Sequence, residues 1–134
     1  MNYWLVKSDP ETYSWQHLLK DGSTSWDGVR NYAARNHLKG MKKGDKVFVY
    51  HSGEETAVVG IASVLKEHYQ DPITDETAWV AVKLKAEKAL KKPVTLSQIK
   101  ADKRLKNILL IKIGRLSVMP ITPEEFAAIL EMGS

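Results

Sequence analysis

Short strand-like segments recur along the chain without the regular alternation with helices that a doubly wound fold requires. They combine β-branched and aromatic residues and are bounded by turn residues, which is typical of strands. These segments occupy residues 2–7, 46–50, 57–65, 78–86, 108–113 and 116–119. Helical or capping patterns occupy residues 14–20, 31–39, 95–100 and 122–130. The sequence therefore predicts an α+β fold, in which a mainly antiparallel sheet closes towards a barrel and carries short peripheral helices.

Gly60 interrupts the apolar run of residues 57–65. A glycine inside a strand marks either a bulge or a place where another group approaches the backbone closely. We therefore expect one of these features in the middle of this strand.

The length and composition limit the classes of protein that fit. The 134 residues are expected to form a single domain over residues 1–132, with residues 133–134 as a possible cloning scar or tail. The chain has no cysteine, which excludes disulfides, thiolate zinc sites and cysteine nucleophiles. No apolar run approaches the roughly 20 residues of a membrane span, and no signal peptide is present. We expect a monomer in the cytoplasm of a bacterium or the nucleus of a eukaryote, neither secreted nor bound to a membrane.

The net charge of +4 is unevenly distributed along the chain. Residues 31–51 carry +4 and residues 83–115 carry +9, while the segments around them are acidic. A fold that gathers the basic segments on one face would attract phosphate and nucleic acid. The alternative is a solvated surface, which is the usual role of charge runs. The residues expected to contact phosphates are Arg35, Lys39, Lys42, Lys43 and Arg115.

The segment of residues 25–32 concentrates side chains that suit a flat polar ligand. A tryptophan face stacks on any nucleobase, and an asparagine can bond a base edge. Trp26 and Asn31 supply these groups beside Gly28 and Arg30, at a junction between a loop and a helix. Backbone N–H groups at such a helix start are available to an anion. The alternative is a core tryptophan with Arg30 and Asn31 capping the helix.

Two predicted strands end in polar residues. Lys7 and Ser8 end the first, and His51 and Ser52 follow Tyr50 at the end of another. An imidazole beside a hydroxyl suits proton transfer or ligand binding. The alternative is a turn with a solvent-exposed ring.

Catalytic and cofactor signatures are absent from the sequence. It contains no G-x-G-x-x-G, P-loop, H-E-x-x-H or G-x-S-x-G pattern, and its four histidines lack the spacing of metal ligands. Ser8, Asp27 and His51 supply the inventory of a Ser-His-Asp triad, but triads are recognised by geometry and nothing in the spacing supports one. We expect no cofactor and no metal.

Six motifs together resemble the EVE domain of the PUA-like superfamily. They are the segments 3–10 (YWLVKSDP), 26–36 (WDGVRNYAARN), 44–45 (GD), 50–52 (YHS), 59–62 (VGIA) and 115–118 (RLSV). The resemblance covers essentially the whole chain. It implies a pseudo-barrel with a pocket for a flipped-out modified base, with modified cytosine in DNA as the associated target and RNA as a further partner. The pocket residues it implies are Lys7, Ser8, Trp26, Val29, Arg30, Asn31, Tyr50, His51, Ser52, Leu116 and Ser117.

The sequence departs from the family pattern in two places. Asp9 stands where the usual motif has glutamate, and Gln70 stands where proline is common. The loop after Tyr69 is also shorter than in many members. Because this loop is expected to border the pocket mouth, substrate breadth or nucleic-acid docking is expected to differ here.

The function expected from these features is that of a non-enzymatic reader. Trp26, supported by Tyr50, would stack on the base, and Val29 with Leu116 would accept a methyl group. The polar groups expected to read the base edge are those of Ser8, Asn31, His51 and Ser117. Two alternatives stay open: an enzyme acting on a nucleobase or RNA, with His51 as acid or base and Lys7 as its electrostatic partner, and a small-ligand or protein-interaction module.

Overall fold

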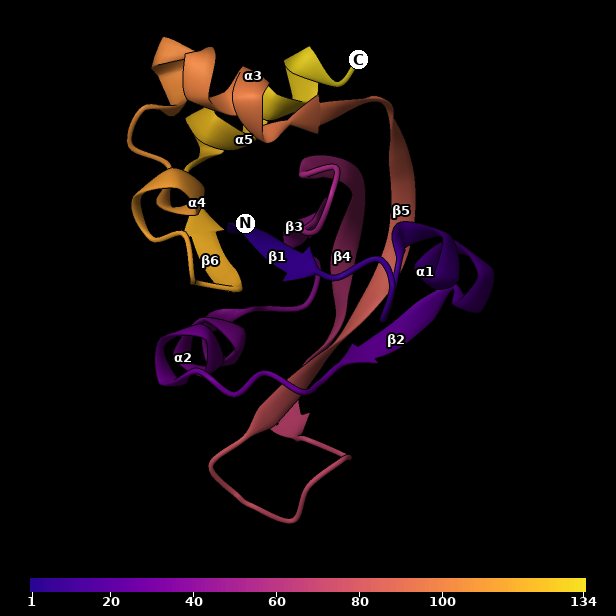
Figure 1. The fold of residues 1–134 in the computed structure, drawn as a ribbon. Helices are drawn as coiled ribbons and strands as arrows, with labels where there is room; N and C mark the ends of the chain where they lie inside the picture. The colour runs from indigo at the N-terminus through magenta and orange to yellow at the C-terminus, as the bar shows by residue number, and fades with distance from the viewer.

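The computed structural model describes residues 1–134 and contains one six-stranded mixed sheet with short helices around it (Figure 1). The strands are β1 (Tyr3–Ser8), β2 (Ser23–Trp26), β3 (Lys46–His51), β4 (Ala57–Gln70), β5 (Val80–Thr95) and β6 (Val118–Ile121). The helices are α1 (Trp15–Asp21), α2 (Tyr32–Gly40), α3 (Leu96–Ala101), the 3₁₀ helix η1 (Lys103–Leu105), α4 (Leu109–Lys112) and α5 (Pro123–Met132). This arrangement confirms the expected α+β class.

The strand order is β2-β5-β4-β3-β1-β6, and only β1 and β3 pair in parallel. The long β4–β5 pair changes register at four places, and each change marks a bulge or irregularity. Bulges bend a strand and increase its twist. The sheet curls as a result: β2 and β1 are separated by three strands in the sheet, yet both line one cavity.

The helix starts follow the capping signals in the sequence. Ser14, Thr95 and Thr122 each form a complete capping box, in which the cap side chain and the third helical residue exchange hydrogen bonds. Asn31 caps α2 through its side-chain oxygen, which accepts the Ala34 N–H at 2.9 Å. No helix combines the length and apolar character needed to cross a membrane.

The structure corrects three strand predictions. Residues 109–112, predicted as strand, form the one-turn helix α4, because the open edge of β1 is occupied by β6 and the Ile108 carbonyl is bonded locally by Ile111 and Lys112. The strand predicted at 116–119 lies at 118–121 instead. The polar segment Ser23–Trp26, which was not predicted as a strand, pairs antiparallel with β5.

The core contains a close contact between Gly60 and Trp15. A Cβ atom on Gly60 would lie 2.5 Å from the Trp15 indole, so only glycine leaves room for this ring to lie against β4. The register of β4 against β5 also shifts between Val58 and Gly60. Both features expected at Gly60 are therefore present. The contact fixes α1, which carries Trp15, against the sheet.

We expect Gly60→Ala to destabilise the protein by about 1–3 kcal/mol, because the added methyl group overpacks a closed core. Urea unfolding followed by tryptophan fluorescence measures this change. Gly114→Ala is the matched control, since nothing lies within 4 Å of a Cβ atom at that position. Equal stability of the two variants would contradict this account of the core.

Candidate functional site

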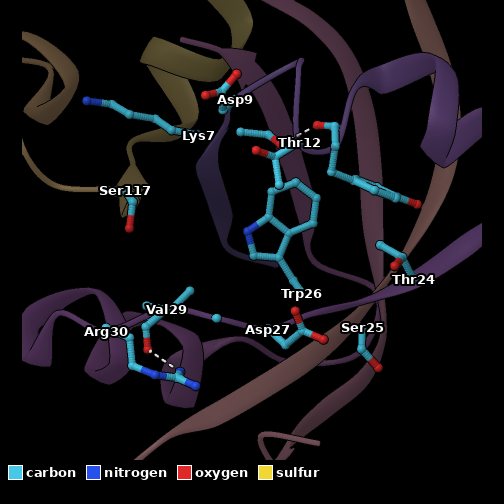
Figure 2. A pocket seen from close by; sticks show the side chains of 13 residues that line it. Lys7, Asp9, Thr12, Thr24, Ser25, Trp26, Asp27, Val29, Arg30 and Ser117 are labelled. Atoms are coloured by element: carbon cyan, nitrogen blue, oxygen red, sulfur yellow. Dashed lines mark hydrogen bonds between the residues drawn. The ribbon is translucent and has the colours of Figure 1, made fainter. Parts of the chain in front are cut away.

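A cavity of about 480 Å³ opens between the end of β1, strand β2, the loop before α2 and the segment before β6 (Figure 2). Segments far apart in the sequence meet here, since residues 7–9 and 117 face residues 24–30 across it. The lining residues are Lys7, Ser8, Asp9, Thr12, Tyr13, Thr24, Ser25, Trp26, Asp27, Gly28, Val29, Arg30 and Ser117. Most of them are polar, and Trp26 is the largest apolar group among them.

Trp26 stands in the middle of this cavity (Figure 2). It ends β2, where it pairs with Val82 of β5, and its side chain is only 9% exposed. The Tyr13 ring meets the indole edge-on, with the ring centroids 6.3 Å apart. Val29 is buried beside it and adds an apolar wall. The ring is thus held in place by the protein while its free surface faces the cavity.

Lys7 and Ser8 connect the end of β1 to both neighbouring segments. The Lys7 backbone N–H donates to the Ser117 carbonyl at 2.9 Å, and the Lys7 ammonium donates to the Gly114 carbonyl at 2.7 Å. Burial lowers the pKa of Lys7 below its ordinary value. The Ser8 hydroxyl donates to the Tyr13 carbonyl. These bonds keep the wall formed by β1 fixed.

A buried carboxylate holds the loop before α2. The Asp71 side chain is fully buried and accepts hydrogen bonds from the Gly28 N–H at 2.9 Å, from Arg30 Nη1 at 2.9 Å and from the Ile73 N–H at 2.8 Å. Gly28 has a φ of 77°, a value that favours glycine. Burial alone would raise the pKa of Asp71, but the bonds from Ile73, Gly28 and Arg30 together hold it below its ordinary value.

Asp27, which follows Trp26 in the chain, is one of two carboxylates in the cavity lining (Figure 2). Burial, and then the charge of Asp71, raise the pKa of Asp27. The lining also contains Asp9, and its cations are Lys7 and Arg30. Because two acidic and two basic groups balance, the cavity suits a neutral polar ligand better than an anion.

Six of the eleven residues expected at the pocket line this cavity: Lys7, Ser8, Trp26, Val29, Arg30 and Ser117. Asn31 is exposed, and its side chain caps α2. Leu116 is buried in the core, as is Tyr50, which lies against Lys7 with the ammonium 5.9 Å from its ring centroid. These three residues lie outside the cavity lining.

His51 and Ser52 also lie outside the cavity lining. His51 Nε2 accepts the backbone N–H of Trp15 at 2.9 Å, which ties the start of α1 to the end of β3. Burial lowers the pKa of His51, so the neutral ring that can accept this bond is favoured. The Ser52 N–H donates to the Ser8 carbonyl at 2.9 Å. Through these bonds, His51 and Ser52 join the end of β3 to the start of α1 and to the end of β1, which lines the cavity.

The cations expected to bind phosphates are dispersed. Lys42 pairs with Glu67 at 3.9 Å, and both Lys42 and Lys43 lie before β3, whose start is roughly 16 Å along the parallel strands from the level of Ser8. Lys39 is exposed at the end of α2, and Arg35 donates to the Ala78 carbonyl. Of this set, exposed Arg115 lies within two residues of the cavity-lining Ser117.

The larger basic segment is divided as well. Lys83 pairs in register with the cavity-lining Ser25 on β2. Arg104, in contrast, bonds Asp102 and Glu131 beside α5. The basic segments therefore converge on the cavity only in part. No three His, Asp or Glu side chains are grouped so as to hold a metal ion.

Seven lining residues were not assigned to the pocket from the sequence: Asp9, Thr12, Tyr13, Thr24, Ser25, Asp27 and Gly28. Four of them, Asp9, Ser25, Asp27 and Gly28, lie in segments that the sequence analysis had singled out. Thr24 and Ser25 were missed because β2 was not recognised as a strand. Its alternating pattern before Trp26 is the signal that would have found it. The hydrogen bond from Ser8 to the Tyr13 carbonyl holds Thr12 and Tyr13 at the cavity. No local sequence pattern predicts this bond.

We expect Asp71→Asn to lower the free energy of unfolding at pH 7 by about 1–3 kcal/mol, because three donors lose an ionised acceptor. The folded pKa of Asp71 lies below its unfolded value, so its contribution is complete above the unfolded pKa and is lost as the pH falls through the folded one. The difference between wild type and variant should therefore shrink in acid.

Urea unfolding at a series of pH values measures this difference. Asp75→Asn, at an exposed position of the same loop, should follow the wild type throughout. If the difference in unfolding free energy between wild type and Asp71→Asn stayed constant into strong acid, the ionised form of Asp71 would not be the source of its stabilisation.

Comparison with known proteins gives consistent results over the whole chain. The family model described as the EVE domain matches residues 2–132. Thymocyte nuclear protein 1 of Gallus gallus is 35% identical, over 97% of this chain and 68% of its own length. A solved structure from Agrobacterium tumefaciens is 40% identical with a TM-score of 0.98, covering 100% of this chain and 94% of that one.

A further solved structure shows human THYN1 in complex with DNA that contains 5-methylcytosine. It is 32% identical to this chain with a TM-score of 0.93, and the match covers 100% of this chain and 98% of that one. An EVE domain can therefore bind nucleic acid. The family match, the sequence identities and the shared fold agree, and this chain belongs to the EVE domain family.

Proposed function

We propose that this protein binds DNA that carries a modified cytosine and holds that base, flipped out of the stack, in the cavity beside Trp26. The observation that carries the proposal is the cavity of about 480 Å³, formed by a fixed tryptophan and a largely polar lining. The complex of the homologous human THYN1 with 5-methylcytosine DNA supports the choice of ligand.

Stacking on Trp26 supplies the main attraction for the base. A flipped base costs a few kcal/mol to unstack, and stacking on an aromatic ring returns about 1–3 kcal/mol. Because Tyr13 and the walls of the cavity already hold the indole, the protein loses little conformational entropy when the base enters.

Polar groups around Trp26 provide hydrogen bonds to the edge of the base. Asp27 offers a carboxyl group with a raised pKa, and Ser117 offers a hydroxyl on the opposite side of the cavity. Val29 provides the apolar wall that accepts a methyl substituent. Burying one methyl group contributes only about 1 kcal/mol, so preference for the modified base is modest.

The function proposed is binding without catalysis. His51, the candidate acid or base, accepts the Trp15 N–H and lies outside the cavity lining. The lining contains no histidine, and its two cations are engaged, Lys7 with the Gly114 carbonyl and Arg30 with Asp71.

Binding of a free small ligand is the second candidate function. The position of Lys42 and Lys43 at the far end of β1 and β3, away from Ser8, favours it over extended contact with a phosphate backbone. The two functions differ in salt dependence, because only binding to phosphates releases counterions. Affinity that is insensitive to salt and equal for a free nucleoside and an oligonucleotide would favour the small ligand.

We expect Trp26→Ala to weaken binding of a 5-methylcytosine oligonucleotide at least roughly tenfold, because the stacking surface is lost. The wild type should prefer the methylated oligonucleotide about fivefold over the unmethylated one, which corresponds to about 1 kcal/mol. Fluorescence anisotropy with both oligonucleotides measures these affinities.

Trp26→Phe keeps an aromatic face and should retain most of the affinity. Circular dichroism checks that each variant is folded. Equal and weak binding of both oligonucleotides by the wild type and by Trp26→Ala would overturn the proposal.

A further inference from the structure

The loop between β4 and β5 presents an exposed isoleucine. This loop, residues 71–79, projects from the sheet below β2 and α2 (Figure 1). Ile73, two residues from the base of the loop, is 64% exposed, which only the terminal Met1 exceeds among the large hydrophobic residues. A side chain this exposed adds little to the stability of the core. Its position relative to the cavity therefore bears on function.

The loop is held in one shape by its own hydrogen bonds. The Asp71 N–H donates to the Trp79 carbonyl at 3.1 Å, which closes the base of the loop. The Gln70 amide donates to the carbonyls of Thr74 at 3.1 Å and Glu76 at 2.8 Å. The Trp79 indole N–H donates to Glu76 at 2.9 Å. The loop that carries Ile73 is therefore held in place by several hydrogen bonds.

The same loop is joined to the rim of the cavity. The Asp71 carboxylate accepts the N–H groups of both Ile73 and Gly28, and Gly28 lines the cavity. A Cβ atom on Gly28 would lie 3.8 Å from Ile73 Cδ1. The exposed isoleucine is thus fixed next to Gly28, on the outside of the cavity lining.

We propose that Ile73 is a wedge that enters the DNA stack at the position vacated by the flipped base. This inference rests on the proposed function. A flipped base leaves a gap between its neighbours, and proteins that deform DNA commonly insert isoleucine, leucine, methionine or phenylalanine between base steps. The position of Ile73 outside the cavity, at its rim, suits this second role.

The base of the loop carries Arg35, a cation that fits a flanking phosphate, and beside it Arg30, which is paired with Asp71. The Arg30 guanidinium lies over the Trp79 ring, 5.4 Å from its centroid, and that of Arg35 lies over Tyr32 at 4.9 Å. Arg35 also donates to the Ala78 carbonyl at 3.1 Å. An exposed apolar side chain with the positive charge of Arg35 on the same loop complements a base step with its phosphates.

The test compares duplex and single-stranded oligonucleotides with one 5-methylcytosine each. A single strand can present the base without leaving a gap in a duplex, so only the duplex needs the wedge. We expect Ile73→Ala to weaken duplex binding roughly tenfold, equivalent to about 1.4 kcal/mol, with little change for the single strand. Ile73→Met keeps a large apolar side chain and should bind the duplex as the wild type does. Leu130→Ala, at an exposed position on α5, should also bind as the wild type does.

A 2-aminopurine next to the methylated cytosine adds a readout of the gap itself. Its fluorescence should differ between the saturated complexes of the wild type and of the Ile73→Ala variant, because only isoleucine stacks on the neighbouring base. Unchanged duplex affinity of Ile73→Ala, or equal weakening of duplex and single strand, would overturn the wedge alone. Failure of the wild type to bind either methylated oligonucleotide would overturn both the proposed function and the wedge.

Discussion

The site depends on one buried carboxylate, that of Asp71. It accepts hydrogen bonds from Gly28, Arg30 and Ile73, which belong to two loops about 43 residues apart in the chain. Without an ionised acceptor, the Gly28 and Ile73 N–H groups and the Arg30 guanidinium would lose their shared partner, the buried Asp71 carboxylate. The bonds therefore fix the rim of the cavity and the β4–β5 loop as one unit. Both the cavity beside Trp26 and the position of Ile73 follow from this arrangement.

Hydrogen bonding also decides which polar residues face the cavity and which support it. His51 and Asn31 have the chemistry of ligand-binding groups, but each is engaged at a helix start, His51 with the Trp15 N–H and Asn31 with the Ala34 N–H. The free N–H groups at a helix start need acceptors, and these side chains provide them. Ser117, which was predicted at the pocket, and Asp27, which was not, are polar groups that the fold leaves in the cavity with Trp26.

Much of the fold could be predicted because its signals are local. The capping boxes at Thr95 and Thr122 were visible as side chains three residues apart, and Ser14 was visible as a cap; each begins a helix. The apolar run around Ile108 was misjudged, since a short apolar run has the same composition in a buried strand and in a buried helix. Only the neighbouring strands decide between them, and here β6 already occupied the edge of β1.

The strand-rich α+β class, the helix starts, the special role of Gly60 and the importance of the segment around Trp26 could all be predicted from the amino-acid sequence. These features depend on residues within a few positions of one another, or on a glycine whose absent side chain is itself the signal. The tertiary structure alone decided that Asp71 braces the cavity rim, that His51 serves α1, and that the basic segments meet the cavity only in part. Such contacts join residues tens of positions apart, and they exist only once the curled sheet has brought its strands together.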